Sequence, residues 1–223
     1  MLLPLLMAGL LAGAPPALEQ ARDRQDRAAL EKIVAEYSDA AAKAPKDAEA
    51  QYRAALAASY LAAVQIEMHE RKPARAVAER GIEAADRAIA LKPDNADYYA
   101  VLGTLCGQAV TDLMSGLRYG PRAKEAVEKA VEKAPKSSNV YLARGVGNLY
   151  LPAQLGGGPK VAIPDLRKAI QIDAKNAEAY LWLGIALRDE HNNAEARQMI
   201  ERALALNPNR VWAKQQLDKT PAQ

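Results

Sequence analysis

The sequence lacks phenylalanine, and it holds only one cysteine, Cys106, and two histidines among its 223 residues. A single cysteine excludes an internal disulfide framework and any zinc site built from four cysteines. His69 has no second histidine four residues further on, which excludes the helical ligand pair of a zinc peptidase. His191 precedes two asparagines and is expected in a solvated turn. We therefore expect no metal, no cofactor and no catalytic residues.

An excess of charge of one sign is also missing, since 30 Lys+Arg are interleaved with 27 Asp+Glu. A nucleic-acid-binding protein normally concentrates its basic residues on one face, so this class of partner is disfavoured. Aromatic residues are scarce at 5%, although hydrophobic residues reach 50% and alanine is abundant. Because alanine is the strongest helix former, this composition favours an all-α protein.

The first seventeen residues carry no charged side chain, unlike the chain that follows them. Their apolar run is shorter than the roughly 20 residues of a membrane-spanning helix, and small residues follow it. The pattern predicts a secretory signal peptide over 1–17, cut before Leu18 because Pro15 would hinder a cut after Ala14. We expect the mature protein in the periplasm or outside the cell, without an integral membrane span.

A recurring break divides the rest of the chain into alanine-rich amphipathic stretches. Each break combines a residue that stops one helix, usually proline, with Asp, Asn or Ser that can cap the next. The breaks stand at Pro45, Pro93, Pro135, Pro208 and, with alanine in place of proline, Ala174. They predict a single domain of about ten helices over 18–223. Its parts are a cap helix at 21–44, helix pairs at 47–93, 95–135, 138–174 and 177–208, and a second cap helix at 210–219.

The last pair shows the clearest spacing of side chains. Its marker residues are Tyr180, Leu183, Gly184, Leu187, Ala196, Ile200, Ala203 and Pro208. This order is similar to the tetratricopeptide (TPR) repeat of about 34 residues, and the chain resembles that family. The resemblance implies an all-α, right-handed solenoid of antiparallel helix pairs. Gly184 and Ala196 are small, as expected where two helices cross at close range.

The upstream pairs match this repeat once insertions are allowed. We expect nearly two extra turns in each helix of the first hairpin, with the turn near Lys72 and Pro73. In the second pair the surplus residues, 113–120, are expected to form an apolar elbow. In the third pair the surplus is a loop at 151–159. Its Gly-Gly-Gly-Pro-Lys run lacks the Gly-Lys-Ser/Thr of a phosphate-binding loop, and we expect a tight turn.

TPR stacks usually bind a partner on the concave surface formed by their first helices, so the resemblance implies a binding protein and not an enzyme. It places these residues on that surface: Arg53, Tyr60, Thr104, Gln108, Leu142, Val146, Leu149, Tyr150, Leu181, Ile185 and Arg188. The Lys and Asn with which some members clamp a peptide carboxylate are missing. The residues between 142 and 185 predict an apolar binding patch instead, unless the long first hairpin or another subunit covers it.

Two functions fit this surface. The first is an exported scaffold that binds a protein or peptide partner in its concave groove. The second is a carrier of a small apolar ligand that serves a transporter, because the chain also resembles, more weakly, secreted TPR proteins associated with TRAP-type transporters. A sealed cavity would favour the carrier, whereas an open trough would favour the scaffold.

Overall fold

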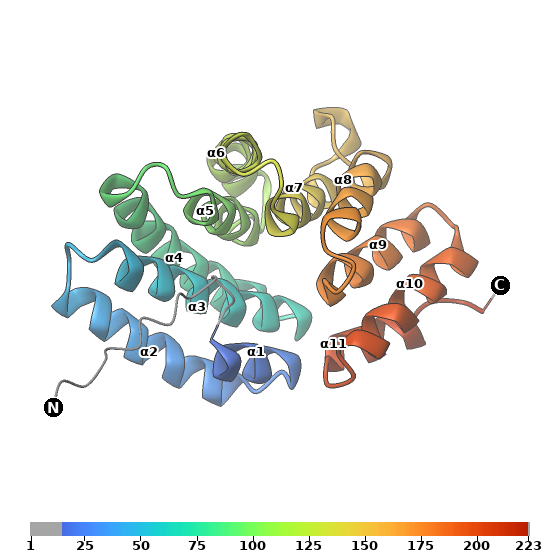
Figure 1. Cartoon of the computed structure of the whole chain (residues 1–223), viewed down its shortest axis with the longest axis horizontal. Coiled ribbons are helices and arrows are strands. Elements are labelled where there is room, and N and C mark those ends of the chain that lie inside the picture. The colour runs from blue at the N-terminus through green and yellow to red at the C-terminus, as the bar shows by residue number, and fades with distance from the viewer. Residues whose placement is uncertain (1–14, 223) are drawn as a thin grey trace, which may run out of the picture.

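The computed structural model describes residues 15–222, which form eleven α-helices and one short 3₁₀ turn without any strand. Antiparallel helix pairs stack side by side and curve around a common middle (Figure 1). The helices are α1 (Pro16–Asp23), α2 (Arg27–Lys43), α3 (Ala48–Glu67), α4 (Arg71–Leu91), α5 (Ala96–Gln108), α6 (Leu113–Lys133), α7 (Ser138–Tyr150), α8 (Pro159–Ile172), α9 (Ala177–Asp189), α10 (Asn193–Leu206) and α11 (Val211–Asp218). The predicted all-α stack of helix pairs is confirmed.

Polar side chains cap the helices at the breaks between them. The carboxylate of Asp47 accepts hydrogen bonds from two backbone amides in the first turn of α3. At the break without a proline, Asn176 accepts a hydrogen bond of 3.1 Å from the amide of Ala179. Such a cap satisfies an amide that has no partner inside the helix. The break therefore forms although Ala174 stands where the other copies have proline.

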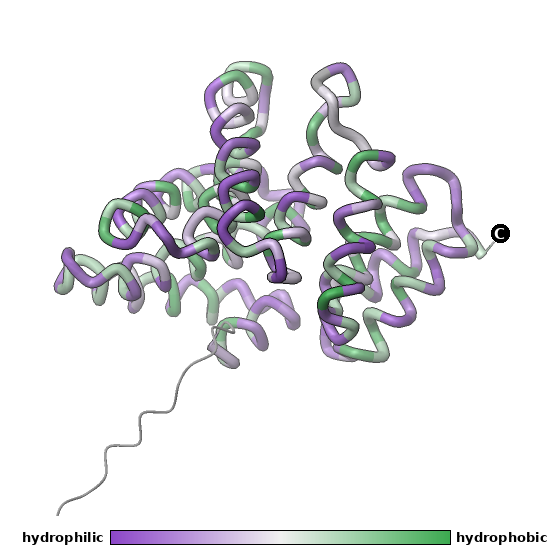
Figure 2. Tube along the Cα trace, turned by 45° about the horizontal axis from the view of Figure 1, so that its top comes forward, coloured by the Kyte–Doolittle hydropathy of each residue, from purple (hydrophilic) through white to green (hydrophobic). Residues whose placement is uncertain are grey.

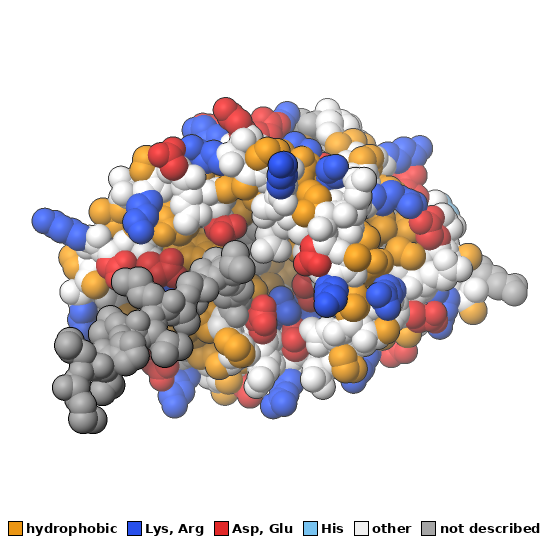
Figure 3. Space-filling view, in the orientation of Figure 1, with side chains coloured by type: hydrophobic (Ala, Val, Ile, Leu, Met, Phe, Trp, Pro, Cys, Tyr) orange, Lys and Arg blue, Asp and Glu red, His pale blue; other side chains and the backbone are white. Residues whose placement is uncertain are grey.

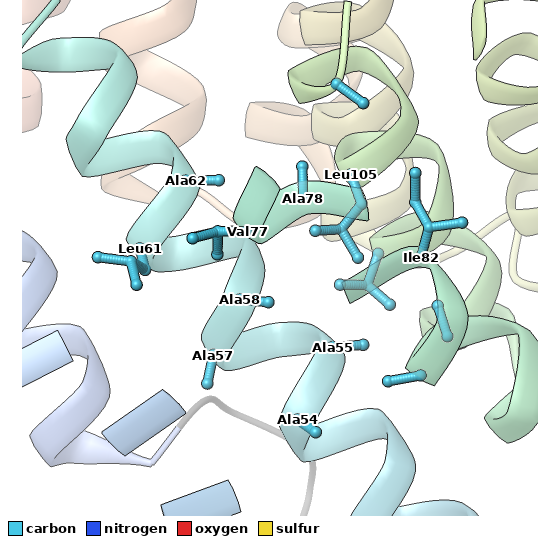
Figure 4. Close-up of a cluster of buried hydrophobic side chains, with 14 of the residues drawn as sticks. Ala54, Ala55, Ala57, Ala58, Leu61, Ala62, Val77, Ala78, Ile82 and Leu105 are labelled. Carbon is cyan, nitrogen blue, oxygen red and sulfur yellow. The ribbon is translucent and has the colours of Figure 1, made fainter. Parts of the chain in front are cut away.

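Small side chains bring the helices of the first pair close together. Green and purple alternate along the helices in Figure 2, which marks them as amphipathic. Figure 4 shows Ala55, Ala58 and Ala62 pointing from α3 toward α4 and α5, into the largest buried cluster. At the same crossing a β-carbon on Gly81 would lie 2.9 Å from that of Ala58. This approach leaves no room for larger residues and fixes how the two helices pack.

The N-terminal cap differs from the single helix expected at 21–44, because two helices, α1 and α2, occupy this part of the chain. Gln25 separates them with a φ of 52°, in the left-handed region that ends a helix. Helix α1 begins at Pro16 and buries Leu18 completely. The expected signal peptide thus overlaps the start of α1, while its residues 1–14 lie outside the described residues.

The first hairpin is longer than the others, as its insertion predicts. Helices α3 and α4 have 20 and 21 residues, against 13 and 14 in α9 and α10. Its turn lies at residues 68–70, earlier than expected, where His69 takes a φ of 65°. Pro73 falls in the first turn of α4, where the amide that proline lacks would have no intrahelical partner.

The expected elbow at 113–120 is wrong, because these residues form the first two turns of α6. Asp112 and Ser115 cap this helix reciprocally, each side chain accepting a hydrogen bond from the other residue's backbone amide. A capping box of this kind starts a helix firmly. The insertion at 151–159 does form a loop, in which Gly156 and Gly158 take φ values of 83° and 100°.

Candidate partner-binding surface

The first helix of each pair, α3, α5, α7 and α9, faces the middle of the molecule, and α6, α8 and α10 lie outside them (Figure 1). In the same orientation, Figure 3 shows a hollow near the middle, with hydrophobic side chains in its depth and charged ones at its edge. The concave side is therefore a mixed surface, apolar in its depth and charged around it.

Two residues predicted for this surface are core residues instead. Leu181 and Ile185 are only 1% and 6% exposed, and they share a buried cluster with Trp212 and Ala213 of α11. The prediction that they line an open groove is wrong, because they pack into a cluster with Ile200 and Ala203 of α10 and with these residues of α11. Their cover includes the C-terminal cap helix, and the first hairpin has no residue in this cluster.

The apolar residues predicted on α7 remain at the surface to different degrees. Leu142, Val146 and Leu149 are half-buried and pack against the cluster between α8 and α9. Tyr150, at the end of α7, is 63% exposed. The exposed apolar area is thus smaller than predicted and is concentrated near the C-terminal end of α7.

Three aromatic rings in a row connect α7 to the C-terminal cap. Tyr150 meets the half-buried Trp182 edge to face, with ring centroids 5.8 Å apart and planes at 78°. The ring centroids of Trp182 and Trp212 are in turn 5.0 Å apart. Leu149 of α7 packs against the buried cluster that α9 shares with α11. We call Leu149, Tyr150 and Trp182 the aromatic shelf. Leu149 and Tyr150 were predicted for the concave surface, whereas Trp182 was missed because the repeat pattern does not show that Trp212 of α11 packs beside it.

The hydroxyl of Tyr150 lies in a crowded, charged environment despite its exposure. Desolvation raises the pKa of Tyr150 from its ordinary value of 10.0 to about 12, so its hydroxyl stays protonated even in mildly alkaline solution. The charges that act on it are those of Arg71, Asp189, Glu67 and Arg188, two of each sign. Tyr150 can therefore offer a partner both its ring and a hydrogen-bonding hydroxyl.

The polar residues predicted on the first two inner helices already have partners in the chain. Arg53 pairs with Glu49 one turn earlier on α3, its Nε 3.0 Å from the carboxylate oxygen Oε1. The hydroxyl of Thr104 donates a hydrogen bond of 3.0 Å to a backbone carbonyl of its own helix. These side chains would have to exchange existing contacts in order to bind a partner.

The remaining predicted residues connect neighbouring elements. Gln108 donates a hydrogen bond of 3.0 Å to a carbonyl of α3, and Arg188 donates one of 2.9 Å to Gln216 of α11. The guanidinium of Arg22 lies 5.0 Å from the centre of the Tyr60 ring, a cation–π distance. Tyr60 and Arg188 therefore mark where the ends of the stack approach its inner helices.

Reactive groups are few along the part of the chain that the structure describes. Residues 15–222 contain no group of three His, Cys, Asp or Glu placed to hold a metal ion. Cys106 is buried, and its desolvation raises the pKa of the thiol to about 12. In the same range no helix has both the length and the apolar character needed to cross a bilayer.

Two depressions of the described surface are lined by residues outside the aromatic shelf. One of about 540 Å³ is lined by Arg27 and by residues 69–73 at the turn between α3 and α4. Another, of about 280 Å³, lies between α1 and α2 and is lined mostly by polar and small side chains. Neither has the apolar lining that a carrier of an apolar ligand would need.

Comparison with known proteins agrees with this architecture. Residues 157–217 match the family model of the tetratricopeptide repeat. No curated protein matches the chain at a significant level. TTC0263, a thermophilic TPR protein of Thermus thermophilus, is 18% identical over 92% of this chain and 96% of its own, with a TM-score of 0.66. The HusA haemophore of Porphyromonas gingivalis is 21% identical over 88% and 96%, with a TM-score of 0.51. At these identities the likeness is one of fold.

Proposed function

We propose that this chain is an exported, non-catalytic scaffold that binds a protein or peptide segment on its concave side, with the aromatic shelf as the main contact. The TPR-like fold supports a binding role, since such stacks typically present a concave surface to a protein or peptide. The observation that carries the proposal is Tyr150, which is 63% exposed although Trp182 holds its ring in place.

The energetics favour a shelf of this kind as a contact site. A tyrosine fixed by its neighbours loses little conformational freedom when a partner covers it. Covering a large apolar side chain contributes about 1.5–3 kcal/mol, so a few such contacts can produce micromolar affinity after the cost of association. The four charged groups around Tyr150 can then discriminate among partners.

A photo-cross-linking amino acid at position 150 tests this function in the native host. We expect it to join the protein to a discrete partner, and Tyr150→Ala to abolish co-purification of that partner while the helical circular dichroism spectrum stays unchanged. Leu117 provides the matched control, since it is 66% exposed on α6, an outer helix that contributes nothing to the shelf. Cross-links at position 117 to the same partner, or capture that survives Tyr150→Ala, would place the contact elsewhere.

The export part of the proposal is supported by the uncharged apolar start of the chain. Its cleavage site has a structural constraint, because a cut before Leu18 would remove the proline that begins α1. Mass spectrometry of the protein from the periplasmic and cytoplasmic fractions of its native host would measure its amino terminus and its location. A protein that retains Met1 and stays in the cytoplasm would contradict export.

A further inference from the structure

The two ends of the helix stack meet across the concave side. Asn207, which follows α10, donates a hydrogen bond of 2.7 Å to the carboxylate of Asp23 at the end of α1. Gln25 and Gln215 exchange hydrogen bonds of 3.2 and 3.5 Å through their amide groups. These residues are 184 and 190 positions apart in the sequence. The solenoid is thus closed into a ring by contacts between its first and last elements.

A buried arginine stands at the centre of this junction. Arg210, just before α11, is 4% exposed and forms a two-pronged ion pair with Glu67 at the end of α3, which is 5% exposed. Its Nε also donates a hydrogen bond of 2.9 Å to Glu178 at the start of α9. One guanidinium therefore ties three elements together, in the planar geometry that suits arginine and carboxylates.

A second arginine extends the network. Arg22 donates a hydrogen bond of 2.7 Å to Asp23 and lies 3.7 Å from Glu178. Two guanidinium groups and three carboxylates, all poorly exposed, thus occupy the junction. We call this set the clasp: Arg22, Asp23, Glu67, Glu178 and Arg210.

The junction differs in kind from the other helix contacts. Neighbouring helices are joined by buried apolar clusters, and the cluster that includes Leu18 of α1 is separate from the one that includes Trp212 of α11. Between the two ends, long polar side chains make the connection. Ion pairs return little net stability after desolvation, whereas apolar contacts are strongly favourable. The clasp is therefore the interface of the ring that separates most easily.

We propose that the clasp is a releasable closure: it holds the solenoid shut around the hollow, and its release moves α1 and α11 apart to admit a partner segment. Its role in admission rests on the proposed function, but the opening itself does not. Each charged group of the clasp becomes solvated on opening, which compensates for the lost ion pairs. Trp182 and Trp212, next to the junction, would become more accessible.

Spin labels on α2 and α10 measure the opening directly. Ala35 and Ala205 are exposed on these helices and outside the clasp, so Ala35→Cys and Ala205→Cys can carry the labels. We expect Arg210→Met to shift the distance distribution to longer and broader values. A rise from about 0.1 M to about 1 M salt shortens the screening length from about 10 Å to about 3 Å. In the protein that retains Arg210, this rise should shift the distance distribution in the same direction by a smaller amount.

The control variant is Lys129→Met, which removes an exposed ion pair with Glu125 within α6 and should leave the distance unchanged. If Arg210→Met loses helical content, Glu67→Gln provides the second test, because it removes one charge and keeps the size of the side chain. An unchanged distance in a folded Glu67→Gln or Arg210→Met protein would overturn the proposal.

Acrylamide quenching of tryptophan fluorescence tests access to the hollow. The chain has two tryptophans, and Glu67 reaches Trp212 only through Arg210, whose guanidinium lies 5.5 Å from the centre of the Trp212 ring. Glu67→Gln should raise the quenching constant, and a short bismaleimide joining Gln25→Cys to Gln215→Cys should lower it. Equal quenching constants in the Glu67→Gln protein and the cross-linked protein would overturn the proposal that opening of the clasp admits a partner segment. Because neither measurement uses a partner, failure of binding at Tyr150 would leave the result on the clasp intact.

Discussion

A β-carbon on Gly184 would lie 2.5 Å from Cγ1 of Ile200, inside the contact distance of two carbon atoms. The backbone carbonyl of Ala196 is next, at 2.9 Å. Helices α9 and α10 therefore cross at the point where the repeat spacing requires a glycine, and neither can move without disturbing a buried neighbour.

Gly184→Ala is expected to lower the free energy of unfolding by about 1–3 kcal/mol, because overpacking outweighs the better helix propensity of alanine. Gly147→Ala, on α7, is the matched control, since nothing lies within 4 Å of a β-carbon there. It should be neutral or stabilise by up to about 1 kcal/mol. Urea unfolding measures both, and equal effects of the two changes would contradict the close crossing.

Ile185→Asp is expected to disrupt the C-terminal end of the stack. Ile185 is buried in the cluster that includes Trp212, and even its truncation to alanine should cost about 2–5 kcal/mol. The aspartate adds the desolvation of an unpaired charge. Val161→Asp on α8, at an exposed position, should change the free energy of unfolding by less than about 0.5 kcal/mol. A stable Ile185→Asp protein with native tryptophan fluorescence would show that α11 does not cover this residue.

Acid should weaken the closed ring through Glu178. Burial raises the pKa of Glu178, but the charges of Arg210 and Arg22 outweigh that effect and hold the pKa below its ordinary value of 4.5. A lowered pKa contributes stability above the ordinary value, and this contribution is lost as the pH falls through the folded-state pKa. The free energy of unfolding should therefore drop below about pH 4.5, and less steeply in Glu178→Gln.

Glu19 requires a separate control in that experiment. Burial raises the pKa of Glu19, so it takes up a proton more readily in the folded protein and gains stability as the pH falls. Its contribution opposes that of Glu178. Glu19→Gln should accordingly make the acid loss steeper, and the same slope in both variants would exclude these assignments.

Cys106 should resist modification in the native protein. It is buried on α5, and desolvation raises the pKa of its thiol to about 12, so little thiolate exists at pH 8. An aromatic disulfide reagent should react only after denaturant is added, whereas an introduced Ser38→Cys on the exposed side of α2 should react at once. Rapid modification of the native protein would mean that α5 opens locally.

Local sequence signals predict most of the fold. Proline stops and polar caps such as Asn176 act within a few residues, so the helix pairs follow from spacing alone. The division of the cap at Gln25 escaped prediction because neither glycine nor proline marks it. The beginning of α6 could have been found from Asp112 and Ser115, whose spacing is that of a capping box.

The candidate site depends on contacts that spacing does not encode. The repeat pattern places Ile185 on the inner face of α9, and that face is covered because the next inner helix, α11, shares a buried cluster with it. Arg210 and Glu67 are 143 residues apart, and their pairing follows from the curvature of the whole stack. Curvature sums small rotations between successive helices, including those changed by the insertions. Single-position patterns therefore identify the inner helices and miss the junction between the ends.

The meeting of α1 with α10 and α11 changes how this solenoid should unfold. In a linear array each unit depends on its immediate neighbours, so the two terminal units fray independently. Here Asn207 and Gln215 near the C-terminal end donate hydrogen bonds to Asp23 and Gln25 near the N-terminal end. Each terminal unit therefore has neighbours on both sides. Removing residues 207–223 should consequently increase amide hydrogen exchange in α1 and α2, at the opposite end of the sequence. The two terminal units should therefore unfold cooperatively.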